Sequence, residues 1–308
     1  MLTLPPSFFE YTRVTREGAA GRAWAESLPA LVETLCARWS LRIDGELMHG
    51  ANGIAVPVLR EGVPYVLKVA WLDEELKAQM LCLRLWDGRG VVRLIDASVE
   101  DGALLLERLD SSRSLRAVPL DEALTIAAGL LRRLAIPLSS TTGRWDKLSV
   151  ATLPTTQALA LNFIDSSHTR SASLGHPIPA HVLDLARDLA RQVATVSDEL
   201  LVNYDLHDEN ILAGEREPWL AIDPRVVVGV PEYGVAQLLW WRLDDMDGER
   251  GLLRSLDLIV KSADLDWDLA RAWTIVRSVD YWLWGLANGL TIDPVRCARI
   301  VETLSGVG

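Results

Sequence analysis

Three polar residues in the second half of the chain have the spacing of a single site. Asp205 and Asn210 lie five positions apart, and Asp223 follows a run that reads as a β-hairpin with its tip at residues 213–218. A short loop that begins at Asp205 and enters a strand at Asn210 can place a carboxylate beside a hydroxyl group. Asn210 and Asp223 add two hard oxygen donors, the kind of ligand that Mg²⁺ prefers. Because Asp, His and Asn are also ordinary turn residues, the spacing needs support from the rest of the chain.

The catalytic loop and the metal-binding Asp of protein kinases have this same spacing. Further motifs accompany it, namely Asp-Leu-His at 205–207, Asn-Ile-Leu at 210–212, Ile-Asp-Pro at 222–224, Gly229, and the longer runs at 83–94 and 216–224. With these motifs the chain resembles the aminoglycoside phosphotransferases, and within them the branch of streptomycin and hydroxyurea phosphotransferases. The similarity spans roughly residues 40–290.

The resemblance implies an α+β, protein-kinase-like bilobal fold. A small lobe with a five-stranded antiparallel sheet would occupy residues 1–108, and a larger, mainly helical lobe residues 109–308. The implied activity is transfer of the γ-phosphoryl group of ATP, with Mg²⁺, to a hydroxyl group of a small molecule. Asp205 would orient that hydroxyl and accept its proton, while Asn210 and Asp223 would hold Mg²⁺. A kinase of another small metabolite and a non-catalytic nucleotide-binding regulator are the alternatives.

The first lobe reads as five strands and two helices. Apolar or alternating runs predict the strands, and helical periodicity predicts the helices. Pro29 predicts a break in the first of these helices. Residues 1–18 look irregular. The predicted strands cover 41–48, 54–59, 65–70, 91–97 and 103–107, and the helices cover 19–39 and 71–86.

A lysine in one of these strands is a candidate phosphate ligand. Lys68 lies in an apolar strand and resembles the kinase lysine that holds the nucleotide phosphates, although a lone strand lysine could also extend to water. In kinases a Glu on the following helix orients this lysine, and Glu75 is the candidate here. Gln79, one helical turn later on the same face, is the alternative partner. It could hydrogen-bond Lys68 but would supply no charge.

Other residues of this lobe are expected to surround the nucleotide. Gly50, Asn52 and Gly53 form a short turn where kinases have a nucleotide-covering loop, although a plain hairpin turn would look the same. Glu107 and Leu109 fall where the two lobes would join, so their backbone groups could meet the adenine edge. A plain strand end is the alternative there.

The second lobe is predicted to be mainly helical. An amphipathic helix at 120–135 precedes an irregular, Ser- and Thr-rich stretch at 137–179, and a helix at 180–201 leads into the Asp205 loop. Six tryptophans lie on the last helices, and most are expected in the core. These helical patterns cover 233–244, 252–261, 267–287 and 294–304.

The length, the net charge and the cysteines indicate which binding partners and which cellular compartment to expect. A chain of 308 residues is longer than a single hydrophobic core usually supports, so two lobes or domains are expected. The net charge of -11 argues against binding to nucleic acid or to anionic membranes. The three cysteines, Cys36, Cys82 and Cys297, lie in apolar helical patterns and are expected to be reduced. With no secretory pattern and no apolar run of bilayer length, we expect a cytoplasmic monomer that meets a small-molecule substrate.

Some positions depart from the family pattern. Asn203 stands where the loop-ordering His of related kinases lies, and an Asn can hydrogen-bond the backbone in the same way. The resemblance places Val230 and Gly234 where many relatives have acidic residues, which could mean an altered substrate choice or a weakened enzyme. A zinc site is disfavoured because the His and Cys residues lack ligand spacing, and no nucleophile elbow supports a serine hydrolase.

The substrate implied by the resemblance is streptomycin, at its six-position hydroxyl, or a related aminoglycoside, with antibiotic resistance as the outcome. Such cationic sugars need carboxylates near the acceptor. Glu232, close in sequence to Asp223, and Asp280, among several aromatic residues, are the candidates. Sugar alcohols, choline-like amino alcohols and other metabolites are alternatives.

Overall fold

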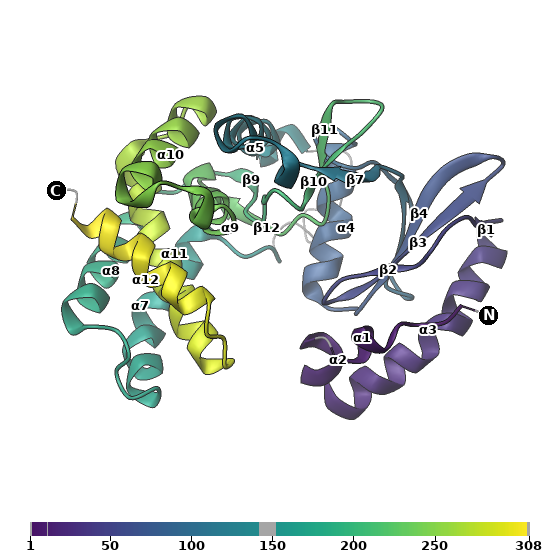
Figure 1. Ribbon diagram of the computed structural model, residues 1–308, viewed down its shortest axis with the longest axis horizontal. Coiled ribbons are helices and arrows are strands. Elements are labelled where there is room, and N and C mark those ends of the chain that lie inside the picture. The colour runs from purple at the N-terminus through teal and green to yellow at the C-terminus, as the bar shows by residue number, and fades with distance from the viewer. Residues whose placement is uncertain (1, 11, 142–151, 307–308) are drawn as a thin grey trace. The chain divides into compact units, whose positions relative to one another are not determined.

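A computed structural model describes residues 2–10, 12–141 and 152–306 (Figure 1). The chain divides into two compact units, which are described separately. The first comprises Met1–Asp110 and Gly214–Arg216, and the second Ser111–Ala213 and Glu217–Gly308. Among the described helices, none has both the length and the apolar character needed to cross a membrane. Cys36, Cys82 and Cys297 are free thiols, as expected.

The first unit is built on an antiparallel sheet with the strand order β1-β3-β4-β6-β5, and β2 also pairs with β3. The run at 41–48 was expected to be one strand but forms two short ones, β1 and β2. The interruption lies opposite Pro57 of β3, which has no N–H to donate to the ladder. The strands are β1 Arg42–Ile43, β2 Met48–His49, β3 Gly53–Arg60, β4 Val63–Ala70, β5 Leu94–Ser98 and β6 Ala103–Glu107.

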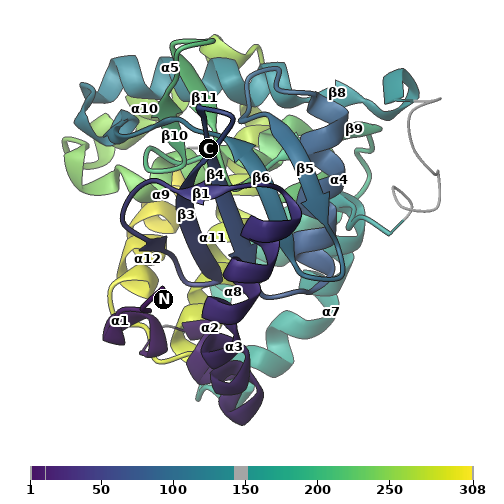
Figure 2. The same ribbon diagram turned by 90° about the vertical axis from the view of Figure 1, so that its right-hand side faces the viewer.

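Helices lie on both faces of this sheet (Figures 1 and 2). Helix α3 (Gly18–Arg38) packs Leu28, Val32 and Leu35 against the buried side chains of β3, β4 and β6. It continues through Pro29, so the predicted break is wrong. Residues 1–18 are not irregular throughout, because they contain α1 (Pro6–Phe9) and α2 (Thr12–Arg16).

Helix α4 (Glu74–Trp86) begins at the N-cap Asp73, whose carboxylate accepts a hydrogen bond from Leu76 N at 2.9 Å. Successive residues of a strand point to opposite faces of the sheet. Because Leu67 and Val69 pack in the cluster with α3, Lys68 points to the other face, where it meets α4. The fold therefore presents the predicted lysine to the predicted helix.

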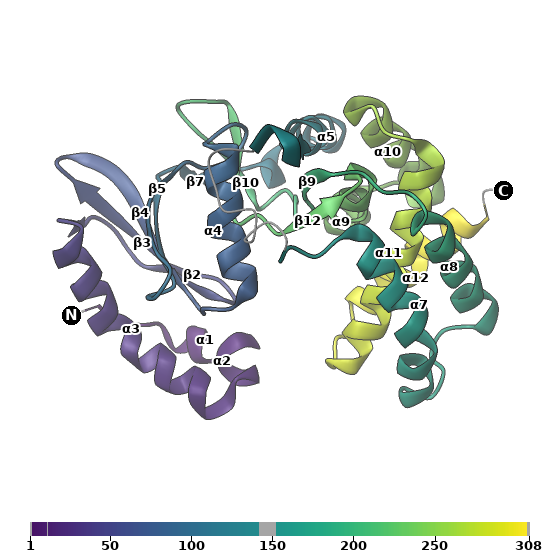
Figure 3. The ribbon, with the colours of Figure 1, turned by 180° about the vertical axis from the view of Figure 1, so that it is seen from behind.

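The second unit is mainly helical, with α11 packed against α8, α9 and α12 (Figure 3). The four helical regions predicted after Asp223 are confirmed. The stretch at 137–179 was expected to be irregular with short helices; residues 142–151 of it lie outside the described residues, and the rest contains the 18-residue helix α7. The helices are α5 Leu120–Leu134, α7 Thr156–Ser173, α8 Ala180–Val193, α9 Val235–Trp241, α10 Gly248–Ala263, α11 Trp267–Ala287 and α12 Asp293–Ser305, with the short 3₁₀ helices η1 Leu115–Ala117, η2 Leu138–Thr141, η3 Pro231–Gly234 and η4 Leu243–Asp245.

Two small sheets, ordered β11-β10-β7 and β12-β9-β8, hold the candidate site of this unit. The predicted hairpin is confirmed as β10 and β11. The helix predicted over 180–201 ends at Val193, and the chain then enters β9. Of the six tryptophans expected mostly in the core, only Trp273 is fully buried, so that expectation is wrong. The strands are β7 Asp110–Ser114, β8 Ile136–Pro137, β9 Leu200–Asn203, β10 Ile211–Ala213, β11 Trp219–Ala221 and β12 Val226–Gly229.

Candidate active site

The loop between β9 and β10 carries Asp205 and Asn210 in a hydrogen-bonded frame. The side chain of Asn203, which is fully buried, accepts a hydrogen bond from Asp205 N at 3.1 Å. Asn210 N donates to His207 O at 2.9 Å, and Asn210 Nδ2 donates to Asp205 O at 3.3 Å. The expectation that Asn203 orders this loop through the backbone is therefore confirmed.

A glutamine that the sequence analysis missed holds the Asp205 carboxylate. Gln237 Nε2 donates to Asp205 Oδ1 at 2.7 Å, and the Gln237 side chain is buried. Gln237 lies on α9, whose sequence Val-Ala-Gln-Leu-Leu-Trp-Trp is otherwise apolar or aromatic. A lone amide in a buried helical run was a signal of a polar partner, because buried polar groups are normally hydrogen-bonded.

Asp223 lies between β11 and β12 and is tied to the same loop. Its neighbour Ile222 donates from N to Asn210 O at 2.8 Å, and Asp223 itself adopts a left-handed backbone with φ of 47°. Asn210 uses its amide nitrogen on Asp205 O, so its amide oxygen is the atom that remains for a cation. One amide oxygen and one carboxylate fit Mg²⁺, which takes its other ligands from phosphates and water. Within the described ranges, no group of three or more His, Cys, Asp or Glu residues could hold a metal ion by itself.

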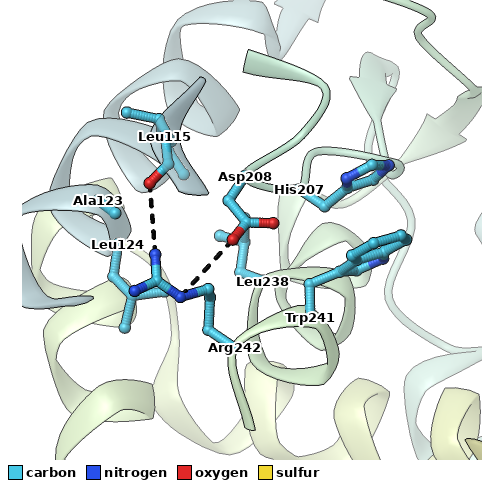
Figure 4. Close-up of a pocket in the computed structure, with 9 residues that line it drawn as sticks. Leu115, Ala123, Leu124, His207, Asp208, Leu238, Trp241 and Arg242 are labelled. Carbon is cyan, nitrogen blue, oxygen red and sulfur yellow. Dashed lines mark hydrogen bonds and ion pairs between the residues drawn. The ribbon is translucent and has the colours of Figure 1, made fainter. Parts of the chain in front are cut away.

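Trp241 at the end of α9 and Arg242 after it lie against His207 and Asp208 of the loop (Figure 4). The His207 ring stacks on Trp241 with ring centroids 4.0 Å apart, and burial lowers the pKa of His207 to about 4. The Asp208 carboxylate is buried beside Arg242 Nε at 3.6 Å and Arg116 Nη1 at 3.4 Å. His207 is thus neutral at neutral pH, and both residues act as supports of the loop.

In the first unit, Lys68 Nζ donates to Gln79 Oε1 at 3.1 Å. Gln79 is buried, whereas Glu75 lies half-buried in the first turn of α4. Lys68 therefore contacts Gln79, the alternative partner, and a role of Glu75 beside the lysine stays a prediction. Because Gln79 is uncharged, it orients the ammonium group without neutralising it.

The glycine-rich turn connects β2 to β3. Gly50 N donates to Gly53 O at 3.0 Å, and Asn52 O accepts from Trp71 N at 2.9 Å. A Cβ atom on Gly53 would lie 2.4 Å from Val69 O, so packing of β3 on β4 alone requires glycine there. Nucleotide binding by Gly50, Asn52 and Gly53 stays a proposal.

Glu107 ends β6 with both its backbone and its side chain engaged. Its N–H donates to Arg93 O at 2.9 Å, and its carboxylate accepts from Arg216 Nε at 3.2 Å and Nη2 at 2.9 Å. The Glu107 N–H is therefore bonded to Arg93 O, and contact of the Glu107 backbone with adenine stays a proposal. Leu109 follows β6 as a half-buried residue, and its contact with adenine stays a proposal.

Both predicted substrate carboxylates have structural contacts. Glu232 is buried, and its Oε1 accepts from Asp266 N at 3.0 Å, at the start of α11. Asp280 forms an ion pair with Arg170, whose Nη2 also donates to Asp280 O at 2.9 Å. The structure therefore gives each carboxylate a role in joining helices, which weakens the case for substrate contact.

The family model for aminoglycoside/hydroxyurea antibiotic resistance kinases matches residues 38–289. The chain belongs to this family. It is 38% identical to streptomycin 6-kinase of Streptomyces griseus over 94% of this chain and 92% of that protein. It is 36% identical to hydroxyurea phosphotransferase of Kitasatospora aureofaciens over 94% of this chain and 82% of that protein.

Solved structures confirm the fold predicted for this kinase. An aminoglycoside phosphotransferase in complex with AMP-PNP and hygromycin B matches with a TM-score of 0.60 at 16% identity, over 92% of this chain and 99% of that one. A choline kinase from Streptococcus pneumoniae matches with a TM-score of 0.56 at 14% identity, over 91% and 99%. At 16% and 14% sequence identity, these two structural similarities support the fold alone.

Gly234 and Val230, which the sequence analysis expected to depart from the family pattern, both lie in packed surroundings. A Cβ atom on Gly234 would lie 2.6 Å from Leu131 Cδ1, so a larger side chain does not fit without rearrangement. Val230 is 3% exposed.

Replacing Gln237 is expected to slow the kinase without weakening ATP binding. Gln237→Leu keeps the size of the side chain but removes the donor to Asp205, so kcat should fall about tenfold or more, as for a lost hydrogen bond to a charged group. Gln237→Glu places a second carboxylate beside Asp205 and should be slower still. Steady-state kinetics with the KM for ATP measured in parallel test this, and wild-type kcat in Gln237→Leu would remove the positioning role.

Stability is expected to depend on pH through Glu232. Burial raises the pKa of Glu232 above its ordinary value of 4.5, so the fold favours the protonated form. This contribution is complete below the ordinary pKa and is lost as the pH rises through the raised one. Glu232→Gln should therefore gain Tm relative to the wild type as the pH rises above the ordinary pKa of Glu232, by about 2 °C.

Thermal unfolding at several pH values measures this effect. Glu249→Gln, at an exposed position in the first turn of α10, is the matched control and should show no such trend. Equal pH trends for both variants would contradict the assignment. A raised KM for a cationic acceptor in Glu232→Gln alone would instead restore Glu232 as a substrate residue.

Proposed function

We propose that this kinase transfers the γ-phosphoryl group of ATP to a hydroxyl of a small cationic sugar, with the six-position hydroxyl of streptomycin as the first candidate. The observation that carries the proposal is the fixed Asp205 carboxylate. Its backbone is held by Asn203 and Asn210, and its side chain is held by Gln237. A preorganised carboxylate can orient an attacking hydroxyl and accept its proton.

The reaction is a displacement at phosphorus. The acceptor oxygen forms a bond to the γ-phosphorus, the bond to the bridging oxygen breaks, ADP leaves, and the hydroxyl proton passes to Asp205. Mg²⁺, when bound, neutralises charge on the phosphates, and Asn210 Oδ1 with the Asp223 carboxylate would hold it. Lys68, oriented by Gln79, is proposed to contact the phosphates.

The choice of acceptor is supported by the named activities of the relatives. Streptomycin and hydroxyurea differ in size, but each carries a hydroxyl group near a planar nitrogen-rich group, a guanidinium in one and a urea in the other. Small cationic sugars also match the negative net charge of the chain, which is -11.

An acceptor panel tests the proposal directly. The full chain is incubated with ATP, Mg²⁺ and one of streptomycin, hydroxyurea, kanamycin or a neutral polyol, and the product is identified by mass. We expect a single added phosphoryl group on streptomycin. Preference for the polyol would overturn the acceptor but leave the phosphotransferase, whereas no product from any acceptor would overturn the function.

A further inference from the structure

Three aromatic rings of α9 and α11 form a continuous stack. Trp240 and Tyr281 have ring centroids 5.1 Å apart and planes inclined by 22°, and Tyr281 stacks on Trp284 at 5.4 Å and 12°. Tyr281 and Trp284 lie three positions apart on α11, so they occupy the same face of that helix. The Trp284 side is the open end, because this residue is 40% exposed.

The stack begins beside the proposed catalytic carboxylate. Gln237, which donates to Asp205, lies one helical turn before Trp240 on α9. Burial, together with the carboxylates of Asp293 and Asp205, raises the pKa of Tyr281. Asp205 is therefore within electrostatic reach of the middle ring.

Hydrogen bonds fix two of the three rings. Trp240 Nε1 donates to Ser278 Oγ at 3.0 Å, and the Tyr281 hydroxyl donates to Asp293 Oδ2 at 3.0 Å. A rigid aromatic surface loses little conformational entropy when a ligand binds to it. Packing between α9 and α11 accounts for the contact of Trp240 with Tyr281, but it leaves the exposed ring of Trp284 unexplained.

The inner end of the stack already binds a guanidinium group of the chain itself. The Arg277 guanidinium carbon lies 4.9 Å from the ring centroid of Trp240 and 4.5 Å and 5.2 Å from those of Tyr233 and Tyr204. Arg277 and Trp284 are seven positions apart on α11, about 10 Å along the helix axis. A second cation at Trp284 would be separated from Arg277 by that distance, with the Asp293 carboxylate hydrogen-bonded to the intervening Tyr281.

We propose that the outer end of the stack, at Trp284, binds a guanidinium group of the acceptor while the acceptor hydroxyl reaches Asp205. Guanidinium is planar and more weakly hydrated than ammonium, so it stacks on an aromatic face more readily. This inference rests on the proposed function and specifies its acceptor as a guanidinium-bearing cyclitol. Trp284 is then a specificity-determining residue.

The test compares Trp284→Leu, Trp284→Phe and the wild type with streptomycin as the acceptor. Trp284→Leu should raise the KM for streptomycin by about fivefold to tenfold, because the cation–π contact is lost. Trp284→Phe keeps a ring and should show a smaller rise. The KM for ATP should stay within twofold in both variants, which a general loss of structure would not allow.

The matched control is Trp267→Leu, a tryptophan in the first turn of the same helix, which should behave as the wild type. An unchanged streptomycin KM in Trp284→Leu would overturn the inference. An equal rise for kanamycin, which has ammonium groups and no guanidinium, would do the same. If the wild-type enzyme phosphorylates no acceptor, the proposed function fails first, and that result is visible before any variant is made.

Discussion

Asp205→Asn is expected to lower kcat by at least about a hundredfold, the usual contribution of a general base. Asparagine keeps the shape of the side chain and an oxygen for the Gln237 amide, so the loop should stay folded. It cannot accept the hydroxyl proton at neutral pH. Affinity for ATP should be nearly unchanged, because Asp205 acts on the acceptor.

Product formation under saturating substrates measures the loss, and calorimetric titration measures ATP binding. Glu209→Gln is the control, since Glu209 lies in the same loop with an exposed side chain. A folded Asp205→Asn variant with the turnover of the wild type would contradict the catalytic role of Asp205. A loss of ATP affinity equal to the loss of turnover would reassign Asp205 to nucleotide binding.

The loop and the hairpin that carry the site could be predicted from the sequence, because both depend on residues close together in the chain. A loop with Asp205 and Asn210 five positions apart and a hairpin before Asp223 are local features, and the structure contains both as β9–loop–β10 and β10–β11. Gln237 was not predictable in this way. It lies 32 positions after Asp205, and only the packing of α9 brings the two side chains together.

Helix α7 shows why periodicity failed over 137–179. Its buried positions, Thr156, Ala160, Phe163, Ser167 and Ser171, have helical spacing, but four of the five are small or polar. A search for apolar stripes therefore finds nothing there. Burial of those residues is decided by the neighbouring helices, which the local sequence does not report.

Strand β9 shows the opposite error. The run up to Leu201 reads as a continuation of α8, yet Leu200–Asn203 pair with β12, and the first two of these residues also pair with β8. Ladder hydrogen bonds to segments far away in sequence outweighed local propensity. The pairing with β12 fixes Asn203, whose side chain accepts from Asp205 N, so the missed strand is part of what orders the site.

Asp223→Asn is expected to change the metal dependence most strongly. Asparagine tolerates the left-handed backbone that Asp223 adopts at φ of 47°, so the substitution removes the charge without straining the chain. The site then has one carboxylate fewer to hold a hard cation. The Mg²⁺ concentration for half-maximal turnover should therefore rise at least about tenfold, and kcat should fall as well. Mn²⁺, which accepts the same oxygen ligands, should restore part of the activity.

Titration of turnover with Mg²⁺ and Mn²⁺ at fixed ATP measures this change. Asp268→Asn, at an exposed position in the first turn of α11, removes one negative charge away from the site and serves as the control. If Asp223→Asn and the control show the same Mg²⁺ midpoint, Asp223 is not a metal ligand. The pair of variants thus separates a local effect of the carboxylate from the effect of a smaller net charge.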